Sequence, residues 1–201
     1  MSDELAGHNP YQPPVARVDD ALEVVEERFQ VVAPWKFLLL MIGTLGLYAL
    51  YWFYRNWTLL NRRHKQYWPV PRAIFSIFFT HSLFEEIDAS VRKRGQAYAW
   101  SHSLWATTYV ISVIASSICD RLAFREIGSP LTDVVSLLLW IPMFSALYVA
   151  QRAINVAEGD PEGDRNARIT ALNVMWLVFG ALGWILVLFG LYLILVEGVE
   201  A

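Results

Sequence analysis

The sequence predicts an all-α integral membrane protein with four transmembrane helices and one amphipathic helix that is either interfacial or re-entrant. Three observations predict this fold class. The chain of 201 residues is 56% hydrophobic and only 17% charged, whereas about 25% of residues are charged in soluble domains. Four long segments contain no charged side chain. Nine Trp and nine Tyr are many for this length, and both residue types collect at membrane interfaces.

Each of the four uncharged segments is long enough to cross a bilayer. A helix needs roughly 20 apolar residues to cross a hydrocarbon core about 30 Å thick. None of the segments alternates polar and apolar residues, so helices are expected and not the strands of a barrel. Pro142 predicts a kink inside the third span. We expect spans at about 36–55, 97–119, 132–151 and 169–196.

A fifth apolar segment is too short to span and becomes amphipathic when it is extended to residues 72–93. Apolar residues recur every four positions from Phe75 to Val91, while polar residues from Ser76 to Arg92 occupy another side. This spacing is typical of a helix that lies on a membrane surface or against a bundle. A re-entrant hairpin is the alternative.

Residues 1–33 precede the transmembrane domain, which we assign to residues 34–197. The Asn-Pro and Pro-Pro pairs within residues 9–14 predict a flexible arm. Asp20 and Glu23 have the spacing of a capping box, which predicts a short helix over 20–32. The first long apolar run begins only near Phe37, so no cleavable signal peptide is expected.

The distribution of Lys and Arg predicts the orientation of the four spans. Short loops rich in these residues stay on the cytoplasmic side. With both chain ends outside, residues 55–97 and 152–168 bring eleven bases to the cytoplasmic side and leave five outside. If residues 73–87 were a fifth span, the bias would almost vanish. We therefore expect loop 55–97 to be cytoplasmic and segment 120–130 to be outside.

The end of the first span carries an aromatic signature. It reads Gly-Thr-Leu-Gly-Leu-Tyr from Gly43 to Tyr48, followed by Tyr-Trp-Phe-Tyr-Arg-Asn-Trp from Tyr51 to Trp57. Over residues 36–60 the chain resembles small bacterial inner-membrane proteins that carry a domain of unknown function. The resemblance implies a bacterial cytoplasmic membrane. That family has no assigned activity, so the resemblance assigns no functional residue.

His81, Glu85 and Glu86 are the first candidates for chemistry. His81 and Glu85 are four residues apart and share a helical face, as two metal ligands would. Neither a nearby cysteine nor the zinc-protease His-Glu-x-x-His pattern supplies further ligands. Glu85-Glu86 also resembles the Glu-Glu-x-x-x-Arg motif of intramembrane prenyl-protein proteases, but Ser90 occupies the arginine position. We therefore expect a solvated, ion-paired helix face, with no metal and no cofactor.

Two further polar residues lie on predicted spans. His102 begins the second span and lies close to Trp100. An ionisable group within a membrane indicates function by default, but histidine is cheap to place at interfacial depth. Asn173 lies near the start of the fourth span. Both remain functional candidates.

Small residues recur on the spans at spacings that let helices approach closely. In lipid, helices associate through close van der Waals contact and interhelical hydrogen bonds. We expect the seams of the second and fourth spans to pack closely, against each other, another span or a second copy of the chain. The predicted packing residues are Gly43, Gly46, Thr108, Ser112, Ser116, Gly180, Gly183 and Gly190.

These features favour a non-enzymatic membrane protein that acts through helix packing as a structural or accessory component. One alternative is a small transporter or channel, which would require buried charges at the midplane, where the spans offer only hydroxyls and Asn173. The other is a membrane-interface enzyme that uses His81 and Glu85. The expected partners are the lipid bilayer and a second copy of the chain or another membrane protein. The net charge of −3 disfavours nucleic acid.

Overall fold

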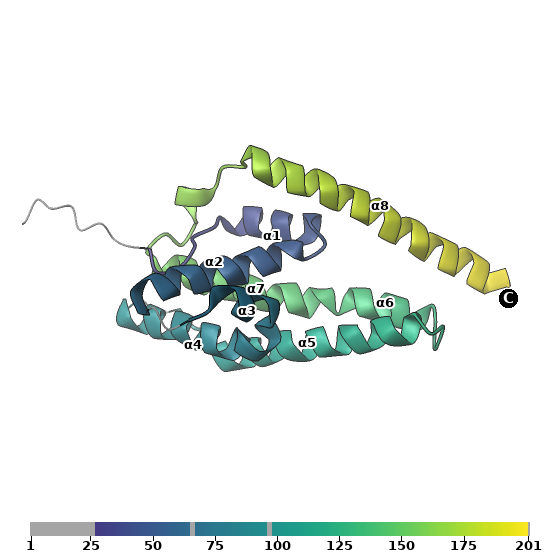
Figure 1. Ribbon diagram of the computed structural model, residues 1–201, viewed down its shortest axis with the longest axis horizontal. Helices are drawn as coiled ribbons and strands as arrows, with labels where there is room; N and C mark the ends of the chain where they lie inside the picture. Colours follow the sequence, from purple (N-terminus) through teal and green to yellow (C-terminus); the bar gives the residue numbers. More distant parts are fainter. Residues whose placement is uncertain (1–26, 65–66, 96–97, 201) are drawn as a thin grey trace, which may run out of the picture.

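The computed structural model describes residues 27–64, 67–95 and 98–200, with side chains except at residues 63–64 and 197–200 (Figure 1). All regular structure in these ranges is helical. The α-helices are α1 (Pro34–Gly43), α2 (Leu47–His64), α3 (Pro69–Ile74), α4 (Ser76–Lys93), α5 (His102–Ala123), α6 (Leu131–Leu138), α7 (Trp140–Ala157) and α8 (Ala171–Glu200).

Three helices in the described part are long and apolar enough to cross a membrane. They cover His102–Ala123, Leu131–Ala157 and Ala171–Val196, which confirms three of the expected spans within a few residues. The second of them consists of α6 and α7, which are separated at Leu139. Pro142 has no N–H to donate to the carbonyl four residues earlier, so the break falls where the sequence predicts a kink.

The expected span over residues 36–55 is wrong as a continuous helix. The chain forms the ten-residue α1, turns at residues 44–46, and continues as α2. Leu45 and Gly46 adopt φ values of 54° and 79°, which end a helix because L-residues seldom occupy this region. The Phe37 ring then packs against the rings of Tyr48 and Trp52, at centroid distances of 5.9 and 6.2 Å. Residues 34–64 are therefore a helical hairpin, called here the α1–α2 hairpin.

The amphipathic segment is also interrupted. Phe75 separates the short α3 from α4, and its ring is exposed together with that of Phe78. Further along α4, Leu83, Ile87 and Val91 are buried as the sequence predicts. The burial extends to Phe84 and, contrary to the prediction, to Thr80 and Asp88 of the expected polar side. The two helices make a second hairpin, called the α3–α4 hairpin. Its longer arm packs against the first half of α5.

Residues 27–33 contain no helix, so the expected helix over 20–32 is wrong for the part that the structure describes; its first residues lie outside the described ranges. Phe29 and Val32 are fully buried, as are Val31 and Ala33 to within a few per cent. The backbone of residues 28–32 is bonded to side chains of α2, α7 and the loop between α7 and α8. This segment, called the strap, therefore lies at the same end of the bundle as loop 158–170.

Figure 1 shows the two ends of the molecule. The strap, the ends of α2 and α4 and loop 158–170 lie at one end, and loop 124–130 lies at the other. The α8 helix starts beside α1 and then runs apart from the other helices for much of its length. In the most apolar stretch of α8, only 6% of the residues are buried. The helix is therefore held to the rest of the bundle over a short part of its length.

Candidate functional site

His81 and Glu85 lie on the exposed face of α4. The His81 Nε2 atom is 3.1 Å from the Thr107 hydroxyl of α5. The described residues contain no group of three or more His, Cys, Asp or Glu side chains that could hold a metal ion. The structure therefore does not gather further ligands around this pair.

Glu86 ties α4 to the strap. Its carboxylate pairs with the Arg28 guanidinium at 2.5 Å and accepts a hydrogen bond from the Tyr67 hydroxyl at 3.2 Å. His102 contacts Asp88 of α4, with 3.4 Å between Nδ1 and the carboxylate. The same carboxylate accepts a hydrogen bond from the Trp100 indole at 3.0 Å. These ionisable groups therefore join segments that are distant in the sequence.

Asn173 caps α8. Its side-chain oxygen accepts the Thr170 N–H at 3.1 Å, and the Thr170 hydroxyl accepts the Asn173 N–H at 3.3 Å. This reciprocal pair satisfies donors that a helix N-terminus leaves without partners. Asn173 therefore lies in the first turn of α8, directly after loop 158–170.

The small residues of α5 and α8 face different neighbours. Ser112 and Ser116 are buried, and the Ser116 hydroxyl is 3.1 Å from the Ser136 hydroxyl of α6. Thr108 instead donates to the Leu104 carbonyl of its own helix. On α8, a Cβ at Gly180 would lie 1.9 Å from the Gly43 carbonyl oxygen. The two seams therefore do not meet each other.

The remaining glycines differ in how closely the chain surrounds them. A Cβ at Gly183 would lie 2.4 Å from the Leu45 side chain, and the α8 contact is completed by the Trp184 indole, which donates to the Ile42 carbonyl at 2.7 Å. At Gly46 a Cβ would approach Phe144 to 3.4 Å, but at Gly190 it would meet no described atom within 4 Å. The α8 contact thus lies mainly at the turn of the α1–α2 hairpin, with a further ring contact between Trp184 and Trp140 of α7 at a centroid distance of 5.9 Å.

A set of buried amide side chains holds the strap. The Asn155 side chain bonds both backbone polar groups of Val32: it accepts the N–H at 3.3 Å and donates to the carbonyl at 2.9 Å. Asn56 accepts the Gln30 N–H at 3.0 Å. Both amides are fully buried. These side-chain amides thus bond the backbone N–H and carbonyl groups of the strap, as a neighbouring strand does in a β-sheet.

Gln151 connects this set to the hairpin. It accepts a hydrogen bond from the Trp52 indole at 2.6 Å and donates to the Gln30 carbonyl and to Asn155. None of these amides is among the residues that the sequence predicts to be functional. The available signal was the recurrence of polar side chains four residues apart on two helices, at Trp52 and Asn56 and again at Gln151 and Asn155.

Glu158 fixes the beginning of the strap. Its carboxylate accepts the N–H groups of Arg28 and Phe29 at 3.0 and 2.9 Å. Burial raises the pKa of Glu158, although these two N–H groups and the nearby Arg165 act in the opposite direction. The raised pKa means that ionising this carboxyl in place costs more than ionising it in water.

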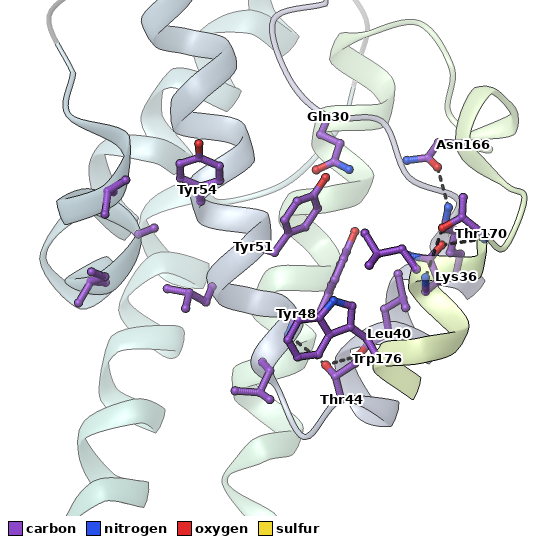
Figure 2. A pocket seen from close by; sticks show the side chains of 17 residues that line it. Gln30, Lys36, Leu40, Thr44, Tyr48, Tyr51, Tyr54, Asn166, Thr170 and Trp176 are labelled. Carbon is purple, nitrogen blue, oxygen red and sulfur yellow. Dashed lines mark hydrogen bonds between the residues drawn. The ribbon is translucent and has the colours of Figure 1, made fainter. Parts of the chain in front are cut away.

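A groove of about 610 Å³ lies between the α1–α2 hairpin and the start of α8 (Figure 2). Tyr48, Tyr51 and Tyr54 of α2 lie along one side of it, and Trp176 of α8 lies across from them. Its lining is mostly apolar and extends to Val70, Ala73 and Ile74 of α3. Volumes of roughly 300–1,000 Å³ are usual for small-molecule sites.

A cluster of polar groups lies at the end of the groove that is formed by loop 158–170. Lys36 is 3% exposed, and its Nζ atom donates to the Asn166 side chain and to the Arg168 carbonyl, at 2.7 Å each. Thr170 lies beside it, and Gln30 lies in the lining next to the Tyr51 hydroxyl (Figure 2). Lys36 is outside the three spans, and burial lowers its pKa. The groove is therefore amphipathic, with a cation at one end.

Comparison of the chain with protein-family models, with curated proteins and with solved structures finds no match. The likeness of residues 36–60 to small bacterial inner-membrane proteins therefore rests on the sequence signature alone, and function has to be argued from the geometry.

Proposed function

We propose that this chain is a non-enzymatic membrane protein that acts through helix packing as a structural or accessory component. In this proposal three helices cross the bilayer, and the two hairpins enter it from one side and return. The observation that carries the proposal is the position of the α1–α2 turn. Gly46 lies against Phe144, near the middle of the span Leu131–Ala157, while the strap lies against Asn155.

The depth of the hairpin follows from helix geometry. At 1.5 Å per residue, eleven residues of α7 between Phe144 and Asn155 correspond to roughly 16 Å, whereas the whole span measures roughly 40 Å. The hairpin therefore ends about halfway across. Four helical segments share one half of the bilayer with the spans, and the other half holds the spans alone. The protein would be broad in one leaflet and narrow in the other.

The charges support an orientation with the hairpins on the cytoplasmic side. Of the fourteen described Lys and Arg residues, only Arg121 and Arg125 lie toward the end that carries loop 124–130. The other twelve lie on the hairpins, the strap, the last turns of α7 and loop 158–170. Basic residues near span ends stay cytoplasmic. Together with the sequence resemblance, this supports a bacterial inner-membrane protein with a cytoplasmic strap.

The polar contacts support packing over chemistry. Glu86, His102 and Asn173 join or cap helices, and the amides of Gln151 and Asn155 are satisfied by the strap instead of lining a passage. The uncovered surface of α8 is available to lipid, a second copy of the chain or another membrane protein.

Cysteine labelling tests the topology. We expect Glu27→Cys and Glu162→Cys to react with a membrane-impermeant maleimide only after the cells are permeabilised, and Ser129→Cys to react in intact cells. Each cysteine is placed in a Cys119→Ser background, which itself serves as the unlabelled control. This labelling pattern is expected because the α1–α2 hairpin enters and leaves the membrane on the same, base-rich side, so Glu27 and Glu162 lie on that side and Ser129 on the other. Labelling of Glu27→Cys and Ser129→Cys from the same side would instead mean that residues 34–64 cross the membrane, which gives four spans.

Complementation tests whether His81 and Glu85 have a catalytic or metal-binding role. In cells that lack the gene, we expect His81→Ala and Glu85→Gln to restore the wild-type phenotype fully, because both side chains are exposed and hold no third ligand. Glu86→Gln is the comparison, since it weakens a structural ion pair and is expected to lower protein abundance. Loss of the phenotype in His81→Ala at unchanged abundance would support the enzyme alternative.

A further inference from the structure

The polar end of the groove holds a cation without a counter-charge. An ammonium group carries three donors, and Lys36 uses two of them on neutral oxygen atoms. No carboxylate of the described residues pairs with it, although it is 3% exposed. Burying a charge is costly unless the charge is paired. An anionic group at this end would supply the missing partner.

The surroundings of Lys36 favour an anion further. Of the seventeen residues that line the groove, Lys36 is the only charged one. Arg168 lies at the same end, where its carbonyl accepts from Lys36, and its exposed side chain forms no ion pair in the described part of the chain. The side-chain oxygen of Gln30 is buried in the lining and accepts no hydrogen bond there. The lining of the groove therefore offers one cation and one acceptor without a partner.

The rest of the groove requires an apolar ligand. From Lys36 it continues past Leu40 and Tyr48 to Leu47 and Leu50, which are half exposed on α2. A soluble anion would fill only the polar end and leave these side chains uncovered. A molecule with an anionic head and a hydrocarbon chain matches both ends.

We propose that the groove between the α1–α2 hairpin and α8 binds an anionic phospholipid of the leaflet that the hairpins enter. The phosphate contacts Lys36, a headgroup hydroxyl donates to Gln30, and an acyl chain lies along Tyr48 and Leu50. The proposal rests on the membrane placement described above, and it adds a specific ligand to it.

Native mass spectrometry of the full-length protein in a neutral detergent tests this site. Dioleoyl-phosphatidylglycerol is titrated against dioleoyl-phosphatidylcholine, which has the same chains and no net charge. Both lipids carry the phosphate, but the trimethylammonium of phosphatidylcholine repels Lys36 and has no hydroxyl to donate to Gln30. The wild type is therefore expected to prefer phosphatidylglycerol by about tenfold. Lys36→Gln is expected to remove that preference. Lys93→Gln, which changes an exposed lysine at the end of α4, is expected to retain it.

A second pair of variants tests the apolar half of the groove. Leu50→Trp fills the groove without changing a charge and is expected to weaken binding of both lipids at least fivefold. Leu186→Trp adds the same ring to an exposed position of α8 outside the groove and is expected to bind as the wild type does. Thermal unfolding of each variant identifies those that do not fold, and binding is compared among folded ones.

Three results would overturn the proposal. The first is equal binding of both lipids by the wild type, and the second is an unchanged preference in folded Lys36→Gln. The third is displacement of phosphatidylglycerol by equimolar glycerol 3-phosphate, because a soluble headgroup would then suffice. Labelling at Glu27 and Ser129 is independent of lipid preference, so a failure of the topology would be recognised separately.

Discussion

Replacing Gly180 with alanine is expected to separate α8 from the rest of the protein. The added Cβ would lie 1.9 Å from the Gly43 carbonyl oxygen and 2.8 Å from the Thr44 Cα. These are backbone atoms, so the clash is relieved only if the helices move apart. Because α8 is attached mainly at this turn, we expect a marked fall in the thermal unfolding temperature in detergent. A disulfide between cysteines at positions 42 and 184 should also form less readily.

Gly190→Ala is the matched control. It lies on the same helix, and its Cβ would meet no described atom within 4 Å. Alanine favours a helix over glycine by about 1 kcal/mol, so this variant is expected to be neutral or slightly more stable. If Gly180→Ala behaved in the same way, close contact between α8 and the hairpin would not exist in solution.

Replacing Asn155 with leucine is expected to cause the largest loss of stability. The N–H and carbonyl of Val32 and the amide of Gln151 would all lose a partner inside the bundle. Each buried polar group without a partner costs about 1–3 kcal/mol, so for the three groups we expect a total loss of roughly 3–9 kcal/mol. Without this anchor the strap should open, and trypsin should cleave after Arg28.

Thr58→Val is the comparison for this variant. The Thr58 hydroxyl donates only to the Tyr54 carbonyl of its own helix, so its removal is expected to change stability by less than about 1 kcal/mol. If Asn155→Leu kept the wild-type unfolding temperature and resisted trypsin at Arg28, the amides would not be what holds the strap.

The sequence was sufficient to predict the three spans because their length and apolar composition leave few alternatives. Residues 171–196 are the clearest case, since they are uncharged and must be helical in lipid. The buried face of α4 was also predictable, because Leu83, Ile87 and Val91 recur with the period of a helix. In both cases the information is local to one segment.

The hairpin could not be predicted in the same way. Hydropathy over residues 36–55 is that of a span, and an average over a window does not detect a reversal at residues 44–46. The turn depends on positive φ at Leu45 and Gly46 and on aromatic packing between α1 and α2. Glycines in this segment were interpreted as packing residues, although Gly46 also ends a helix.

The candidate site was predictable only in part. Asn173 was singled out as polar, but the groove that it lines depends on residues distant in sequence. Lys36 is buried by contacts with Asn166 and Arg168, which follow it by 130 and 132 positions. A lysine before an apolar run is normally exposed at an interface. Its burial therefore could not be inferred without the fold.

The strap also sets an order of events during synthesis. Val32 is bonded to Asn155, and Lys36 to the backbone of Arg168, 132 residues later. At about 5–20 residues per second, the ribosome takes roughly 7–26 s to make that stretch. For most of this time the first hairpin is complete, while Val32 and Lys36 still lack the partners that Asn155 and loop 158–170 supply. The strap and Lys36 thus reach their final contacts only after α7 and loop 158–170 have been made, and until then the backbone of the strap is open to pairing with other extended chains.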